Sequence, residues 1–280
     1  MITVRAALAD AARRLGGAGV ADAEREAAWL LAHVLALRVG ELRVQGDRVL
    51  YPADASAFAG LVERRAGREP IQYILGTEEF LGMTFRVSPA VLIPRLDTEV
   101  LVRETAARLS GATRIADIGT GSGAIAVGLA TLLPQATVVA VDISAAALEV
   151  AASNAARADV AGRVEFRQGD LLEPLADERF DAIVSNPPYI PEGDMPGLMP
   201  EVRRWEPSIA LVAGPDGLDV YRRLVAGATG HLNSGGFLAV EVGIGQAAQV
   251  AELFAGAGLA VETRRDSAGI ERVVVGQCAK

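Results

Sequence analysis

The sequence predicts an α/β protein in which a small N-terminal helical domain precedes a doubly wound, mostly parallel seven-stranded sheet. From Thr113 onward, short apolar runs alternate with helical patterns, as in a parallel sheet that is covered by helices on both faces. Before residue 69, apolar residues instead recur at positions i, i+3 and i+4, which is the period of helices. The length of 280 residues allows two domains of moderate size.

The first third of the chain predicts three helices and a short hairpin. The helical period begins at Thr3, two glycines at 16–17 separate the first two helices, and a further helix is expected over residues 53–65. Residues 78–87 predict two short strands that turn at Gly82. We therefore expect a helical domain at residues 1–69, a β-hairpin connector at 70–96 and a sheet domain at 97–280.

Strands and helices then alternate to the end of the chain. Strands are predicted at residues 114–118, 137–141, 164–168, 180–185 and 237–242. Helices are predicted at 97–109, with Asp97 as the N-cap, and at 123–133, 145–157 and 218–232. An antiparallel hairpin is expected from residues 259–264 and 270–275.

Composition and charge argue against several classes of protein. The formal net charge is -8, whereas a domain that binds naked nucleic acid is usually basic, so no stable nucleic-acid partner is expected. One cysteine, Cys278, and two histidines offer neither a disulfide nor a good metal site, and we expect no metal. The sequence has no apolar run of about 18 residues and no signal-like N-terminus, so a cytoplasmic protein without a membrane association is expected.

A glycine-rich loop follows the first strand of the predicted sheet and opens a helix. Glycines in such a loop allow a tight turn and a close approach of the backbone to a ligand. The pattern fits both a dinucleotide and S-adenosylmethionine (SAM), because Gly119, Gly121 and Ala124 also satisfy the dinucleotide motif. The residues expected to form this part of the cofactor site are Asp117, Gly119, Thr120, Gly121, Ser122 and Gly123.

Three acidic residues at the ends of successive strands favour SAM. Asp117 beside the loop suits the ammonium group of the methionine part and suits a pyrophosphate poorly. Asp142, about 20 residues after the loop, can accept hydrogen bonds from ribose hydroxyls, and Asp170 suits the adenine amino group. Asp142 could instead cap the next helix, and Asp170 could form an Asx turn.

The loop Asn186-Pro187-Pro188-Tyr189 follows the apolar strand at 180–185, and open α/β sheets bind their ligands at the carboxyl ends of strands. Two prolines stiffen the loop and remove two backbone donors. It therefore offers carbonyl acceptors, an Asn amide and an aromatic ring, which suits a flat group that carries NH2.

At this point the chain resembles class I SAM-dependent methyltransferases, and most closely the family that methylates the glutamine amide of peptide chain release factors. The resemblance covers nearly the whole chain. Besides the helical domain and the two loops already described, it rests on residues 68–76 (REPIQYILG), 92–95, 97–99 and 206–207. Two positions depart from the family pattern: Leu96 stands where proline is common, and Ile270-Glu271-Arg272 replaces an Arg-Asp-Arg run.

The resemblance implies N5-methylation of the glutamine in the Gly-Gly-Gln motif of release factors, with SAM as methyl donor. Asn186 and the Pro187 carbonyl would accept the two N–H protons of the amide, and Tyr189 would stack on its plane. Substrate contacts are expected from all four residues of this loop. Ile143, Leu171 and Asn186 complete the expected cofactor site. The helical domain is expected to help dock the protein substrate.

Two other functions remain open from the residues. The same loop chemistry suits an exocyclic amine of adenine or guanine in DNA or RNA. A methyltransferase-like module that binds release factor without turnover is the second alternative. The run Arg203-Arg204-Trp205 could contact the substrate or cover the active-site loop, and the sequence does not decide between these roles.

Overall fold

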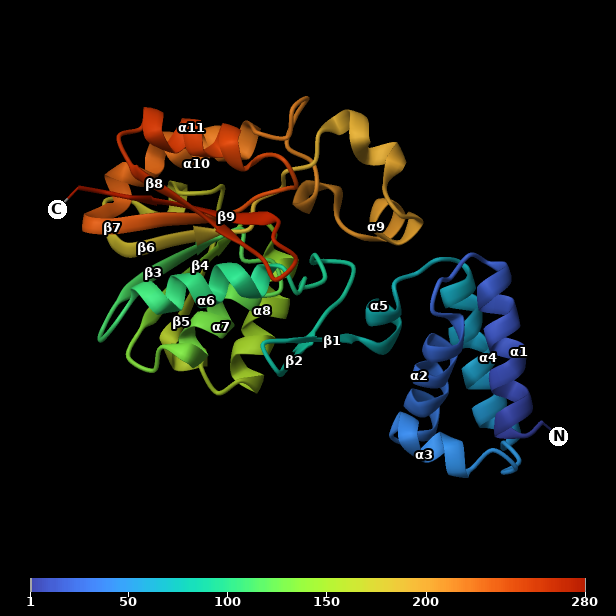
Figure 1. Ribbon diagram of the computed structural model, residues 1–280. Coiled ribbons are helices and arrows are strands. Elements are labelled where there is room, and N and C mark those ends of the chain that lie inside the picture. Colours follow the sequence, from blue (N-terminus) through green and yellow to red (C-terminus); the bar gives the residue numbers. More distant parts are fainter. Residues whose placement is uncertain (1, 280) are drawn as a thin grey trace. The chain divides into compact units, whose positions relative to one another are not determined.

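The computed structural model describes residues 2–279, which form two compact units (Figure 1). One unit contains residues 2–76 together with Met199–Trp205. The other contains Thr77–Leu198 and residues 206–279. The first is helical and the second is built on a sheet, in agreement with the predicted fold class.

The helical unit packs around an apolar core of its own. Its helices are α1 (Val4–Gly17), α2 (Ala23–Leu35), α3 (Val39–Val44), α4 (Pro52–Ala66), α5 (Ile71–Leu75) and α9 (Pro200–Trp205). Thr3 caps α1, because its Oγ1 accepts a hydrogen bond from Ala6 N at 3.3 Å. Leu15, Leu30 and Phe58 are buried in the core that α1, α2 and α4 share. The three predicted helices are confirmed, whereas the short helices α3, α5 and α9 were not predicted.

Helix α9 belongs to this unit although it follows the sheet strands in sequence. Glu201 accepts hydrogen bonds from Arg65 Nη1 at 2.9 Å and from Arg68 Nε at 2.7 Å. Arg65 also pairs with Glu26, and its side chain is only 6% exposed. Burial opposes ionisation of Glu201, but Arg68 and Arg65 together hold its pKa at about 2. These ion pairs attach α9 to the end of α4.

The second unit contains a seven-stranded sheet and a separate two-stranded hairpin. Its strands are β1 (Thr77–Phe80), β2 (Met83–Arg86), β3 (Arg114–Ile118), β4 (Thr137–Asp142), β5 (Val164–Gln168), β6 (Phe180–Ser185), β7 (Leu232–Glu241), β8 (Ala260–Arg265) and β9 (Glu271–Gln277). Its helices are α6 (Thr98–Arg108), α7 (Ala124–Leu132), α8 (Ala145–Arg157), α10 (Asp219–Ala228) and α11 (Ala247–Gly256).

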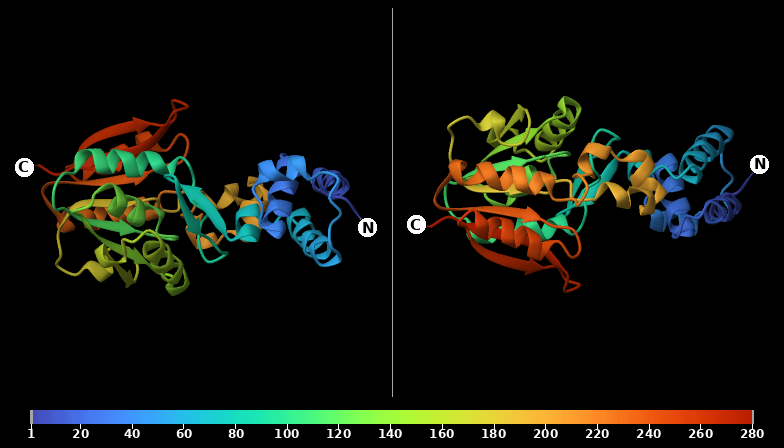
Figure 2. Two further views of the ribbon diagram at one scale, coloured as in Figure 1. Left: turned by 90° about the horizontal axis from the view of Figure 1, so that it is seen from below. Right: turned by 90° about the horizontal axis from the view of Figure 1, so that it is seen from above.

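The large sheet has the order β5-β4-β3-β6-β7-β9-β8. The first five strands in this order, β5, β4, β3, β6 and β7, are parallel to one another. Strand β9 is antiparallel to both of its neighbours. Helices α6, α7 and α8 cover one face, and α10 and α11 cover the other (Figures 1 and 2). The central strands are apolar on both sides because both faces are covered. The doubly wound, mostly parallel sheet that the sequence predicts is therefore confirmed.

Several predicted boundaries were wrong. The helix expected over residues 218–232 ends at Ala228, and Leu232 begins β7, where it pairs with Phe180. Helix α11 was missed. Asp97 precedes α6 but makes no capping hydrogen bond; its carboxylate instead pairs with Arg272 at 3.1 Å. In the part of the chain that the structure describes, no helix is long and apolar enough to cross a membrane.

Candidate active site

A pocket of about 420 Å³ lies at the carboxyl ends of the parallel strands of the sheet unit. Loops after β3, β4, β5 and β6 contribute to it, as expected for an open α/β sheet. The predicted site residues that line it are Gly119, Thr120, Gly121, Ser122, Asp142, Ile143, Asp170, Leu171, Asn186 and Pro188. The other four, Asp117, Gly123, Pro187 and Tyr189, are not among the lining residues.

The glycine loop is held by the neighbouring strand β4. The N–H groups of Gly119 and Thr120 both donate to the Val141 carbonyl at 2.9 Å. Gly119 and Gly121 have φ values of +74° and +55°, and a Cβ at either position would meet no atom within 4 Å. The glycines are thus required by the backbone conformation, and the space beside them is open to a ligand.

Asp117 lies behind this loop at the end of β3 and is completely buried. Its Oδ2 accepts hydrogen bonds from Thr120 Oγ1 at 2.6 Å and from Ala126 N at 3.0 Å, whereas Oδ1 has no partner. Burial raises the pKa of Asp117 to about 7, against the opposing effect of these hydrogen bonds. An unpartnered buried carboxylate oxygen fits a cationic donor such as the ammonium group of SAM.

Asp142 ends β4 and holds two loops together. Its Oδ2 accepts from Gly121 N at 2.8 Å, and its Oδ1 accepts from Ser144 N at 2.9 Å. Helix α8 is capped by Ser144, whose Oγ accepts from Ala147 N at 3.2 Å. The helix cap considered for Asp142 is therefore wrong. Each carboxylate oxygen keeps acceptor capacity, so ribose hydroxyls can still bind to Asp142.

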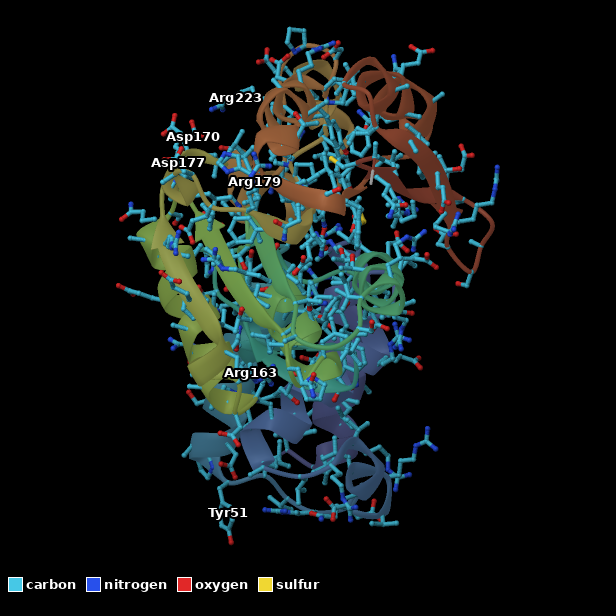
Figure 3. The ribbon with its side chains drawn as sticks, turned by 90° about the vertical axis from the view of Figure 1, so that its left-hand side faces the viewer. Tyr51, Arg163, Asp170, Asp177, Arg179 and Arg223 are labelled. Carbon is cyan, nitrogen blue, oxygen red and sulfur yellow. The ribbon has the colours of Figure 1, made fainter. Side chains whose placement is uncertain are left out.

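Asp170 follows β5 and faces Arg223 of α10 (Figure 3). The Asp170 Oδ2 accepts from Arg223 Nη2 at 2.7 Å, and both residues line the pocket. No Asx-turn hydrogen bond of Asp170 is present among the described residues. The guanidinium neutralises part of the charge of Asp170, and the other carboxylate oxygen can accept from an amino group.

Asn186 follows β6 and lines the pocket. Its Nδ2 donates to Thr98 Oγ1 at 3.1 Å, and Thr98 Oγ1 donates to Glu241 Oε2 at 2.6 Å. Because the NH2 side of the Asn186 amide is used by Thr98, its Oδ1 can accept from another group. Pro187 is buried, whereas the half-buried Pro188 reaches the pocket.

Tyr189 is half-buried and packs against the core beneath α10 and α11. Its backbone carbonyl accepts from Gln246 Nε2 at 2.9 Å. Burial, assisted by the negative charge of Glu241, raises the pKa of its hydroxyl to about 12. Tyr189 is thus neutral at physiological pH and anchors the loop that carries Asn186.

Sequence reasoning assigned no chemistry to several residues that build this site. Thr98 contacts Asn186 directly, and Glu241 is connected to Asn186 through Thr98. Arg95 lines the pocket and donates from Nη2 to Glu206 Oε1 at 2.6 Å. Thr98, Arg95 and Glu206 all lie in segments that carry the family resemblance, and that was their one signal. The neighbouring Leu96 is 76% exposed and does not line the pocket.

Comparison with known proteins connects this geometry to two protein families. Residues 6–76 match the PrmC N-terminal domain, and residues 94–196 match the methyltransferase small domain. A methyltransferase from Pyrococcus furiosus superposes with a TM-score of 0.55 at 20% identity, covering 72% of this chain and 91% of that one. At this identity the likeness concerns the fold alone.

Curated relatives match over most of their own length. The release factor glutamine methyltransferase of Geobacter sulfurreducens is 52% identical over 261 residues, which are 92% of this chain and 91% of the relative. The protein of the same name from Moorella thermoacetica is 48% identical over 254 residues, covering 90% and 89%. With this identity along nine-tenths of both chains, the protein belongs to the release factor glutamine methyltransferase family.

Proposed function

We propose that this protein transfers a methyl group from SAM to the side-chain amide nitrogen, N5, of the glutamine in the Gly-Gly-Gln motif of peptide chain release factors. The observation that carries the proposal is the orientation of Asn186. Its amide NH2 is bound to Thr98, so its Oδ1 is the part that is available to accept at the pocket. The relatives named for glutamine methylation of release factors identify the acceptor.

SAM is the cofactor of this methyltransferase family. When bound, it supplies an activated methyl group on a sulfonium, so the protein has to bind and orient the reactants. We assign the methionine ammonium to the unpartnered Oδ1 of Asp117, which is buried and bonded to Thr120 of the glycine loop. The ribose is assigned to Asp142 and the adenine amino group to Asp170, which both line the pocket. Gly119 to Gly123, Ile143 and Leu171 would surround it.

The chemical difficulty lies in the acceptor, because the lone pair of an amide nitrogen is conjugated with its carbonyl. The rotation barrier of roughly 18–20 kcal/mol shows the strength of that conjugation. Asn186 Oδ1 and the Pro187 carbonyl would accept the two N–H protons and favour a pyramidal nitrogen whose lone pair faces the methyl group. Such positioning can contribute roughly 7–11 kcal/mol when the reacting atoms are aligned.

Loss of the proton completes the reaction. After methyl transfer the amide nitrogen is cationic and strongly acidic, so a strong general base is not required. Pro188 and Tyr189 would contact the flat amide beside Asn186. Tyr189 does not line the pocket, so its stacking on the glutamine requires that the substrate reach past Pro188.

The protein substrate also needs a docking surface. We propose that residues 1–69 form a substrate-docking domain, that 70–96 connect it to the catalytic part, and that 97–280 form the methyltransferase domain. The net charge of -8 supports a protein rather than a nucleic acid as the acceptor. We infer that the enzyme acts in the cytoplasm without a membrane, because release factors work on ribosomes there.

An acceptor assay tests the proposal directly. Labelled SAM is incubated with the enzyme and, side by side, with a release factor, RNA and DNA. We expect label in the release factor and none after its Gly-Gly-Gln glutamine is replaced by alanine. Faster labelling of RNA or DNA would replace the proposal with base methylation. SAM binding without transfer to any of these acceptors would favour a non-catalytic module.

A further inference from the structure

A chain of hydrogen bonds connects Glu241, Thr98 and Asn186. Glu241 ends β7, Thr98 begins α6 and Asn186 follows β6, so three separate elements meet here. The donor–acceptor distances are 2.6 Å from Thr98 Oγ1 to Glu241 Oε2 and 3.1 Å from Asn186 Nδ2 to Thr98 Oγ1. Thr98 is 4% exposed and Glu241 is 1% exposed, so water competes little for these bonds.

The chemistry of the three groups gives this chain a direction. Thr98 Oγ1 donates to Glu241 Oε2, as it must when Glu241 is ionised, because a carboxylate can only accept. The Thr98 oxygen can then only accept from Asn186, which must present its NH2 side. The amide oxygen of Asn186 is thereby turned away from Thr98. With the opposite direction, Asn186 would present NH2 to the NH2 of the substrate, and two donors would face each other.

The surroundings of Glu241 act on its pKa in opposite directions. Burial raises its pKa to about 7, whereas the Thr98 hydrogen bond and the positive charges of Arg272 and Arg95 oppose this rise. Asp97 is the neighbouring acid that favours protonation, and Tyr189 is the phenol that faces the same group. The Glu241 backbone carbonyl accepts from Tyr221 Oη at 2.8 Å, which holds this end of β7 in place.

We propose that Glu241 and Thr98 are positioning residues that orient the Asn186 amide, so that its oxygen rather than its NH2 meets the substrate amide. This inference rests on the proposed function, because it assigns the orientation of the residue that accepts the substrate proton. Glu241 does not line the pocket, whereas Thr98 lines it together with Asn186. A merely structural role for the pair would instead join α6 to β7 without any effect on Asn186.

Variants of Thr98 separate these two roles. Thr98→Val keeps the shape of the side chain and removes the hydroxyl, whereas Thr98→Ser keeps the hydroxyl and serves as the matched control. We expect Thr98→Val to lower the rate of methyl transfer to release factor at saturating SAM by about 10- to 100-fold, the size of effect that misplacement of a reacting group produces. Thr98→Ser should stay within about threefold of the native rate, and the SAM dissociation constant should change little in both.

Glu241→Gln tests the direction of the chain. Its carboxamide has nearly the shape of the carboxylate but can donate as well as accept, so Thr98 is no longer obliged to donate to it. We expect a rate loss of about tenfold with unchanged SAM affinity. The proposal would be overturned if both Thr98→Val and Glu241→Gln were folded and transferred methyl groups at rates within threefold of the native rate.

A measurement that needs no acceptor keeps this inference separate from the proposed function. The side-chain NH2 signals of Asn186 are identified in an NMR spectrum by their loss in Asn186→Ala. We expect these protons to exchange slowly with water in the native protein and in Thr98→Ser, and rapidly in Thr98→Val. Rapid exchange in the native protein would refute the chain of hydrogen bonds. Slow exchange without any methylation of release factor would refute the proposed function alone.

Discussion

Asn186 and Asp142 line the same pocket, but each is held by different parts of the protein. Asn186 is bound to Thr98 of α6, whereas Asp142 accepts hydrogen bonds from Gly121 of the glycine loop and from Ser144 before α8. The amide is therefore available to the acceptor, and the carboxylate shapes the part of the pocket that we assign to SAM. This separation predicts that substitutions at the two residues affect different kinetic constants.

Asn186→Ala should lower the turnover number by about 100-fold and change the SAM dissociation constant by less than threefold, because it removes a contact to the acceptor. Asp142→Ala should raise that dissociation constant by about 10- to 100-fold, since a hydrogen bond to a charged group contributes roughly 1.5–3 kcal/mol. Calorimetry of SAM binding and initial rates measure both quantities. Equal losses of SAM affinity in the two variants would contradict this division.

The buried carboxyl of Asp117 predicts a proton linked to SAM binding. Its pKa of about 7 in the free protein means that much of it is protonated at pH 6. A bound ammonium favours the carboxylate, so binding at pH 6 should release a proton, and affinity should fall as the pH drops from 7.5 to 6. Calorimetry in buffers of different ionisation enthalpy detects this proton.

Asp117→Asn is the matched control for that experiment. It keeps the size of the side chain, cannot ionise, and should bind SAM more weakly without any proton release. Equal proton release by the native protein and by Asp117→Asn would assign the proton to another group.

At the scale of elements, the loop after β6 is held by residues near the starts of α10 and α11. Gln246, at the start of α11, donates to the Tyr189 carbonyl at 2.9 Å. Gly217, before α10, has a φ of +75°, and a Cβ there would lie 2.2 Å from the same carbonyl oxygen. Two segments distant in sequence thus leave room for one loop conformation.

Gly217→Ala should therefore destabilise the protein more than alanine at a glycine with a similar backbone and free space. Gly258 is such a control, with a φ of +80° and no atom within 4 Å of an added Cβ. Gly258→Ala should lower the free energy of unfolding by about 1–2 kcal/mol, because its backbone conformation is unfavourable for alanine. Gly217→Ala should cost a further 1–3 kcal/mol, roughly, from overpacking. Urea unfolding measures both, and equal costs would show that the contact is relieved easily.

At the scale of the whole molecule, the two units are not two continuous stretches of the sequence. Residues 199–205 follow the active-site loop in sequence but pack within the helical unit. In this segment Glu201 is 13% exposed in its side chain and is paired with Arg65 and Arg68. Asn186 and Pro207 both line the pocket, and residues 199–205 between them belong to the helical unit.

Glu201→Ala should loosen α9. Arg65 keeps its partner Glu26, so the expected loss of stability is moderate, roughly 1–3 kcal/mol. Limited digestion with trypsin should cut after Arg203 or Arg204 earlier than in the native protein, because local opening exposes the backbone. Asp194→Ala, an exposed position in the same segment, should leave the digestion unchanged. Unchanged digestion of Glu201→Ala would show that other contacts hold α9.

The sequence predicted the strands with strong local patterns well. Residues 114–118, 164–168 and 180–185 are strands, and 145–157 is a helix, as expected from their periodicity. The predicted end of α10 was wrong because Leu232 belongs to a strand and pairs with Phe180. These two residues are about 50 positions apart, so no local pattern contains this contact. Helix α11 was missed for a similar reason, since its apolar residues are buried against strands that are distant in sequence.

The sequence by itself determined the chemistry of this protein: a glycine loop with acids at strand ends, an Asn-Pro-Pro-Tyr loop, and the family that carries both. These features are local, so residue type and spacing suffice to recognise them. Only the tertiary structure decided how the Asn186 amide is oriented and that Asp117 has an unpartnered oxygen. Thr98 and Glu241, from other elements, set the orientation of Asn186. Ala126, from the helix after the glycine loop, donates to the other carboxylate oxygen of Asp117. Hydrogen-bond direction and burial arise from such contacts, and a linear pattern does not contain them.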